Sequence, residues 1–273
     1  MKFRLAAFAD EAANDLTGQI AAMQENGIEL LEIRGVDGQN IDGISAEKAR
    51  AIRKMLGFSG IGVWSLGSPF GKIGIGDDFA PHLDSFKRSL ETADILGCRH
   101  IRLFSFYGTC ETEPVLERLS AFCDAAKGSG TVLCHENEKG IYGDMAEKCL
   151  EIHKALPQLR AVFDPANFIQ CGQDTKEAWG LLSPYVEYMH IKDALPDGSV
   201  VPAGKGAGEL PYLISQYSGE VLTIEPHLSV FEGFDKLEGD EKSKMSYTYP
   251  DSRTAFSAAV SALKEIIGGQ QNG

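Results

Sequence analysis

The feature that most constrains the fold is a strict alternation of short apolar runs with longer amphipathic segments, repeated eight times along the chain. The apolar runs cover residues 3–9, 29–35, 61–67, 100–106, 131–137, 160–166, 186–192 and 220–227. The amphipathic segments cover residues 14–26, 45–56, 81–96, 113–127, 144–156, 174–182, 209–217 and 251–267. The short runs predict buried strands, and the three-to-four-residue spacing in the longer segments predicts helices that cover them.

Eight strand–helix units within 273 residues predict an α/β protein with a (β/α)8 TIM-barrel fold. A doubly wound open sheet is the alternative, but it usually has a glycine-rich phosphate turn after its first strand, and "FADEAAND" has none. We therefore expect a single domain over residues 1–273. It would include a long polar loop at 228–250 after the last strand and a C-terminal tail at 268–273. A loop of that length is typical of a lid, a partner contact or a partly disordered segment.

Charge and cysteine usage exclude several classes of partner. The formal net charge of −13 argues against nucleic acid and anionic membranes, because both attract basic surfaces. No run reaches the ~20 apolar residues of a membrane span, and Asp10 and Glu11 interrupt the N-terminal apolar stretch before it reaches signal-peptide length. The six cysteines are scattered without a CxxC pair, which is typical of a reducing compartment. We expect a cytoplasmic protein that acts on a small molecule, and a homo-oligomer is compatible with the sequence.

Four consecutive apolar runs end in side chains that can bind a metal ion. These are Glu136, Asp164, His190 and Glu225. In a barrel the carboxyl ends of the strands meet at one face, where active sites lie, so these residues are expected to converge. The alternative, that each acid is a strand-end residue on a solvated loop, weakens when all four occur on successive strands.

Three carboxylates and one imidazole form an oxygen-rich ligand set with a single nitrogen. Such a set suits a hard or borderline divalent ion, so we expect one Mn²⁺ ion per chain, with Mg²⁺, Co²⁺ and Zn²⁺ as alternatives. Carboxylates this close would repel one another and raise their pKa values, and a bound dication removes that repulsion.

The motifs at these strand ends resemble those of the xylose isomerase-like TIM-barrel superfamily. They are "HENEKGIYGD", "FDPAN", "MHIKD", "GKGAGE" and "TIEPH". The superfamily includes tagatose 3-epimerase-like enzymes, hydroxypyruvate isomerase and inosose dehydratase. The resemblance implies that the four residues are the metal ligands and that Glu136 and Glu225 are also the acid–base pair. One position departs from the pattern: Asn167 stands where many members have a histidine that contacts substrate. Asparagine can hydrogen-bond a hydroxyl group but cannot carry a proton at neutral pH.

The resemblance implies a metal-dependent isomerase or epimerase of a sugar, sugar phosphate or polyol. Proton transfer would pass through an enediolate that the metal stabilises. The same ligands also permit loss of a β-hydroxyl group, so an inosose dehydratase-like lyase is the main alternative, and a non-catalytic carbohydrate-binding barrel is a weaker one. A DNA-repair endonuclease of the same fold is disfavoured, because it needs more histidines and a less acidic surface.

Further residues are candidates for substrate contact. Lys192 follows His190 on the same strand face, and Glu32 shares the end of the second strand with Arg34, although an ion pair between these two is the alternative. Trp64 could supply an apolar wall or belong to the core. His135 and His227 flank predicted ligands, and Lys205 lies in a glycine-rich loop, 203–209, that could bind phosphate.

Overall fold

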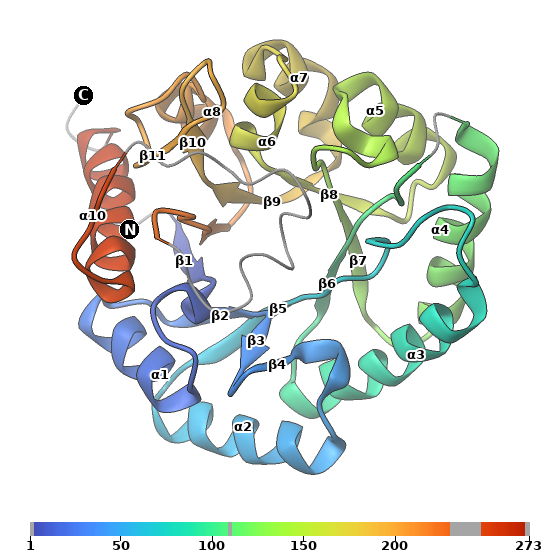
Figure 1. The fold of residues 1–273 in the computed structure, drawn as a ribbon, viewed down its shortest axis with the longest axis horizontal. Helices are drawn as coiled ribbons and strands as arrows, with labels where there is room; N and C mark the ends of the chain where they lie inside the picture. The colour runs from blue at the N-terminus through green and yellow to red at the C-terminus, as the bar shows by residue number, and fades with distance from the viewer. Residues whose placement is uncertain (1–2, 109–110, 230–246, 271–273) are drawn as a thin grey trace.

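The computed structural model describes residues 3–108, 111–229 and 247–270. Eight parallel strands form a closed barrel in the order β1-β12-β9-β8-β7-β6-β5-β2, and helices form a ring around it (Figure 1). The barrel strands are β1 (Arg4–Ala7), β2 (Leu30–Ile33), β5 (Gly62–Gly67), β6 (His100–Leu103), β7 (Val132–Glu136), β8 (Arg160–Phe163), β9 (Val186–Ile191) and β12 (Val221–Ile224). The predicted single-domain TIM barrel is therefore confirmed.

Every predicted helical segment contains a helix. The outer helices are α1 (Leu16–Glu25), α2 (Ala46–Phe58), α3 (Phe79–Leu96), α4 (Thr112–Ala126), α5 (Ala146–Ala155), α7 (Thr175–Leu182), α8 (Leu210–Gln216) and α10 (Ser252–Gln270). Side chains of Asp15, Ser45, Asp78 and Asp174 accept backbone N–H groups at the first turns of α1, α2, α3 and α7. These caps satisfy donors that the helix itself leaves free, and they fix where each helix begins.

One predicted boundary near the C-terminus changes, and one predicted loop is not tested. The helix α10 continues through Gln270, so the tail predicted at 268–273 begins no earlier than residue 271. Most of the loop predicted at 228–250, residues 230–246, lies outside the described residues. Among the described helices, none combines the length and apolar character needed to cross a membrane.

Short elements that the sequence did not predict lie in the loops after the strands. The helix α6 (Pro165–Gln170) begins directly after β8, where Asp164 caps it and Pro165 occupies its first turn. Two hairpins extend other loops, β3 (Gly35–Val36) with β4 (Gln39–Asn40) after β2, and β10 (Asp193–Ala194) with β11 (Val200–Val201) after β9. These additions all lie at the carboxyl end of the barrel.

The amino-terminal half of the barrel interior is filled by side chains. The apolar cluster there comprises Ala6, Leu30, Cys134, Val162, Tyr188 and Val221, with Trp64 and Val132 packed against it. Further along the same strands the inward side chains become polar, as in the step from Cys134 to Glu136 on β7 and from Val162 to Asp164 at the end of β8. The packed half supports the strands, and the carboxyl end is left for a site.

Candidate metal centre and active site

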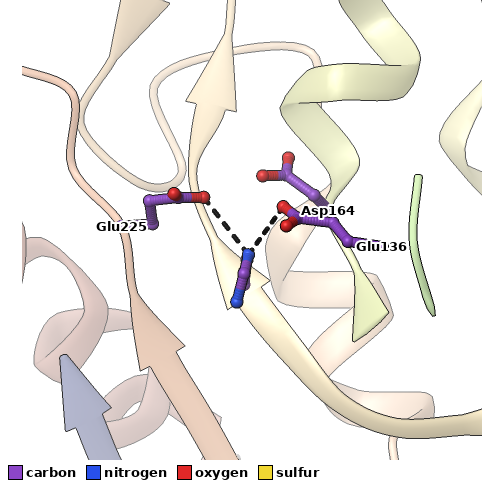
Figure 2. A group of neighbouring side chains, drawn as sticks. Glu136, Asp164 and Glu225 are labelled. Atoms are coloured by element: carbon purple, nitrogen blue, oxygen red, sulfur yellow. Dashed lines mark hydrogen bonds and ion pairs between the residues drawn. The ribbon is translucent and has the colours of Figure 1, made fainter. Parts of the chain in front are cut away.

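The four predicted ligands meet at the carboxyl end of the barrel. Ligand atoms from Glu136, Asp164, His190 and Glu225 all lie within 4.8 Å of one another. Figure 2 shows the carboxylates of Glu136, Asp164 and Glu225 pointing toward one another, and each comes from the end of a different strand. All four side chains are buried, so the cluster is a preformed cage and not a group of surface acids.

The imidazole of His190 presents its two nitrogens to different surroundings. The Nδ1 atom lies 2.8 Å from Oε1 of Glu136 and 3.2 Å from Oε2 of Glu225. The Nε2 atom points away from this group and lies 3.3 Å from Oε2 of Glu32. The Nδ1 atom is therefore the nitrogen that converges with the carboxylates.

Burial and mutual repulsion disfavour ionisation in this cluster. Burial, together with the charges of Glu225 and Glu136, raises the pKa of Asp164 to about 7, against the opposing charge of Lys192. Burial also opposes ionisation of Glu136, but the charges of His190 and Arg102 lower its pKa to about 2. Crowded, buried carboxylates of this kind are stabilised by a cation placed among them.

The donor set fits a divalent ion. Carboxylate oxygens and one imidazole nitrogen match the preferences of Mn²⁺, Mg²⁺, Co²⁺ and, with fewer ligands, Zn²⁺. A metal ion bound at Nδ1 needs that nitrogen without its proton, and Nε2 can then carry the proton toward Glu32.

Two arginines support the acidic residues; the sequence analysis named Arg34 only beside Glu32 and did not name Arg102. Arg102, inside the apolar run of β6, donates from Nη1 to Oε2 of Glu136 over 2.6 Å. Arg34, just after β2, donates to Glu225 over 3.1 Å and to Glu11 over 3.2 Å. A buried arginine within or at the end of an apolar strand was the available signal, because such a charge requires partners.

Asparagines tie the ends of β7 and β8 together. The Nδ2 group of Asn137 donates to the carbonyl of Asp164 over 2.8 Å, and its Oδ1 accepts the backbone N–H of Asp164 over 2.9 Å. The Nδ2 group of Asn167 donates to the carbonyl of Asn137 over 2.9 Å, and the backbone N–H of Asn167 donates to Asp164. This network orients Asp164, and the sequence analysis had not assigned Asn137 a role.

A small pocket opens next to the cluster. Its lining residues come from strand β6 and from the segments that follow six other barrel strands; they are Arg34, Lys72, Arg102, Glu138, Lys139, Asn167, Gln170, Lys192, Glu225 and His227. Lys192 lies between ligands and pocket, with Nζ 2.9 Å from Oδ2 of Asp164 and 3.4 Å from Oε2 of Glu225. The predicted residues Asn167, Lys192 and His227 thus all reach this pocket.

Two larger hollows, around residues 123–133 and 90–99, lie at the opposite end of the barrel.

His227 also forms a second acidic group with Glu11 and Glu225. Its Nε2 atom lies 3.5 Å from Glu11 and 3.6 Å from Glu225, and its backbone N–H donates to Glu11 over 2.7 Å. Arg34 bonds both of these carboxylates, yet burial raises the pKa of Glu11 to about 8, and this group offers three ligands where the other cluster offers four. We therefore assign a cation to the four-ligand cluster alone.

Two predicted substrate residues lie elsewhere. Trp64 stacks on His100, with ring centroids 4.1 Å apart, and packs on the apolar cluster in the amino-terminal half of the barrel. His135 points outward from β7, where its ring packs against His153 and closely approaches Gly143. Burial lowers the pKa of His135 to about 3, so the ring is neutral. Strand alternation explains the error for His135, because the neighbours of an inward ligand point to the opposite face.

The predicted phosphate loop is also corrected. The carboxylate of Asp193 accepts the backbone N–H groups of Gly204, Gly206 and Gly208, over 2.8–3.0 Å. These are donors that a phosphate would have used. Lys205 is exposed to solvent and does not line the described pocket. Glu32, in turn, is fully buried beneath His190, where direct contact with substrate is not supported.

A comparison with family models places the chain in a family. The family model described as xylose isomerase-like TIM barrel matches residues 20–216. The chain belongs to this family. The match ends before β12, so the position of Glu225 in the site rests on the structure. No curated protein matches the sequence significantly.

Several solved structures share the fold at low sequence identity. The IolI protein with a bound zinc atom is 15% identical, with a TM-score of 0.75 over 98% of this chain and 99% of that one. L-ribulose 3-epimerase is 16% identical, with a TM-score of 0.75 over 100% of this chain and 96% of that one. The probable 3-DHS dehydratase AsbF from Bacillus anthracis is 15% identical, with a TM-score of 0.72 over 97% and 99%. At these identities the similarity supports the fold and leaves the reaction open.

Proposed function

We propose that the protein is a divalent-metal-dependent isomerase or epimerase that acts on a sugar, sugar phosphate or polyol. The observation that carries the proposal is the convergence of four buried ligands beside a pocket that one of them, Glu225, also lines. Mn²⁺ is our preferred ion because the set has three oxygen ligands and one nitrogen ligand. We also retain the cytoplasmic location as a proposal.

When bound, the ion would polarise substrate oxygens and lower the cost of removing a proton from a neighbouring carbon. Glu225 is placed to exchange that proton, since among the described residues it is the acidic ligand that lines the pocket. Glu136 is the second candidate, held in place by Arg102 and His190. Asn167 and His227 line the same pocket and can orient substrate hydroxyl groups.

A dehydratase is the second candidate function. The observation in its favour is Lys192, a buried ammonium group that lines the pocket next to Glu225 and can hydrogen-bond a departing hydroxyl group. The similarity to a probable dehydratase, AsbF, is compatible with this reaction.

A substrate screen with product analysis separates the two reactions. Ketoses, inososes and hydroxypyruvate are incubated with the protein and Mn²⁺ in D₂O, and NMR identifies the products. A product that is an isomer of the substrate and carries deuterium on a carbon indicates an isomerase or epimerase. A product that has lost water indicates a dehydratase. Glu225→Gln and Glu136→Gln should each abolish deuterium incorporation. Turnover of no substrate, together with binding of intact sugar, would favour a carbohydrate-binding barrel.

A further inference from the structure

A buried chain of hydrogen bonds runs beneath the candidate metal centre. The Nε2 atom of His190 lies 3.3 Å from Oε2 of Glu32, whose other oxygen accepts the hydroxyl group of Tyr188 over 2.7 Å. The Tyr188 oxygen lies 3.1 Å from the hydroxyl oxygen of Ser65. The four residues come from β2, β9 and β5 and are fully buried.

We propose that Glu32 is a positioning residue that holds the proton of His190 on Nε2 and so presents the lone pair of Nδ1 to the ion. The proposal rests on the proposed metal-dependent function. The two ring nitrogens of a neutral histidine have opposite roles, and the partner of one decides the role of the other. Here the carboxylate partner is on the Nε2 side, while Nδ1 faces Glu136 and Glu225.

The chain has a defined direction. An ionised Glu32 only accepts hydrogen bonds, so both the Tyr188 hydroxyl group and Nε2–H of His190 must donate to it. Tyr188 has then used its one proton, so the Ser65 hydroxyl group donates to the Tyr188 oxygen. The His190 ring is also held by the edge of Phe8, with ring centroids 5.2 Å apart. Ser65 on β5 therefore orients Tyr188, Tyr188 orients Glu32, and Glu32 orients His190.

This direction makes a sharp prediction for Glu32→Gln, which keeps the size of the side chain. With Ser65 as the donor to Tyr188, the Tyr188 hydroxyl group takes the amide oxygen as its acceptor, so the amide NH₂ group faces His190. Nε2 must then accept a hydrogen bond, and the proton moves to Nδ1, where it competes with the ion. We expect Mn²⁺ affinity to fall about 10- to 100-fold, the loss typical of such partners.

The test measures Mn²⁺ binding to the full chain by EPR of free Mn²⁺. The Glu32→Gln/Tyr188→Phe double variant should recover part of the affinity lost in Glu32→Gln, because the amide oxygen is free to turn back toward His190. Such recovery is not expected of a residue that only supports the core. Glu187→Gln is the matched control: its carboxylate lies 3.1 Å from Nε2 of His100, in the amino-terminal half of the barrel, and its loss should leave affinity unchanged.

The outcomes separate this proposal from the proposed function. Wild-type affinity in Glu32→Gln, or equal losses in Glu32→Gln and the double variant, would overturn the positioning role while leaving the metal site intact. Absence of Mn²⁺ binding in the wild-type protein would overturn both.

Discussion

The loop at 203–209 offers a test in which the structure gives the magnitude. Asp193 accepts four backbone N–H groups, those of Ala194, Gly204, Gly206 and Gly208, over 2.8–3.0 Å. In Asp193→Ala, the donors of Gly204 and Gly206 can turn to water, because these residues are not buried. The donors of Ala194 and Gly208 are buried and lose their acceptor. Two hydrogen bonds to a charged group at about 1.5–3 kcal/mol each give a loss of about 4 kcal/mol.

The assay is urea unfolding at pH 7, with the thermal midpoint as a second measure. A loss of this size lowers the midpoint by roughly 10 °C in a protein of this length. Asp197→Ala is the matched control: its side chain lies in the same β10–β11 hairpin and accepts the Ser199 N–H, so its loss should cost about 1 kcal/mol. A loss below about 1 kcal/mol in Asp193→Ala would refute the view that this carboxylate organises the loop.

Three further predictions concern other parts of the barrel. Gly71→Ala should lower the free energy of unfolding in urea by about 3 kcal/mol, because the new Cβ would lie 2.1 Å from the Phe104 carbonyl oxygen at a φ of +90°. Gly60→Ala is the control, with a positive φ but open space, and should cost about 1 kcal/mol; equal losses in the two variants would exclude the clash. Arg102→Met should destabilise by about 3 kcal/mol, since it leaves the buried carboxylate of Glu136 with His190 as its remaining ion-pair partner. A neutral result would remove the Arg102–Glu136 ion pair from the account. Burial lowers the pKa of His153 to about 4, below the unfolded value of 6.5, so the protein loses about 3 kcal/mol of stability as the pH falls from 6.5 to 4. His153→Gln should make stability less dependent on pH in this range, and an unchanged pH dependence would contradict this role of His153.

The sequence was sufficient to predict the barrel and the convergence of the four candidate ligands, because both depend on periodic patterns. Strand and helix patterns alternate along the sequence as the elements do in the barrel, and each candidate ligand ends an apolar run at the same face. The helix α6 was not predicted, because Asp164 serves both as ligand candidate and as helix cap, and the preceding strand pattern runs directly into it. The boundary signal was the Asp-Pro pair.

Residues that support the site depended on contacts between distant strands, which a single sequence does not reveal. Glu32 was predicted on the correct strand face but lies one layer below the pocket, with Tyr188 from β9 as its partner. The large apolar ring of Trp64 would suit the wall of a substrate pocket, but its position early in β5 places it in the amino-terminal half of the barrel, away from the site. Lys205 was chosen from a glycine-rich loop whose donors are already occupied by Asp193. In each case the residue type was informative, and the three-dimensional partner decided its role.

The central claim is that strands β7, β8, β9 and β12 bring four ligands around one divalent ion. A Mn²⁺ titration of metal-depleted protein, with free ion followed by EPR, measures this directly. We predict one ion per chain for the wild-type protein and affinity losses of at least 10-fold in both Asp164→Asn and His190→Gln, with Glu187→Gln unchanged. Binding of no ion by the wild-type protein, or of one ion with unchanged affinity in both ligand variants, would contradict the account.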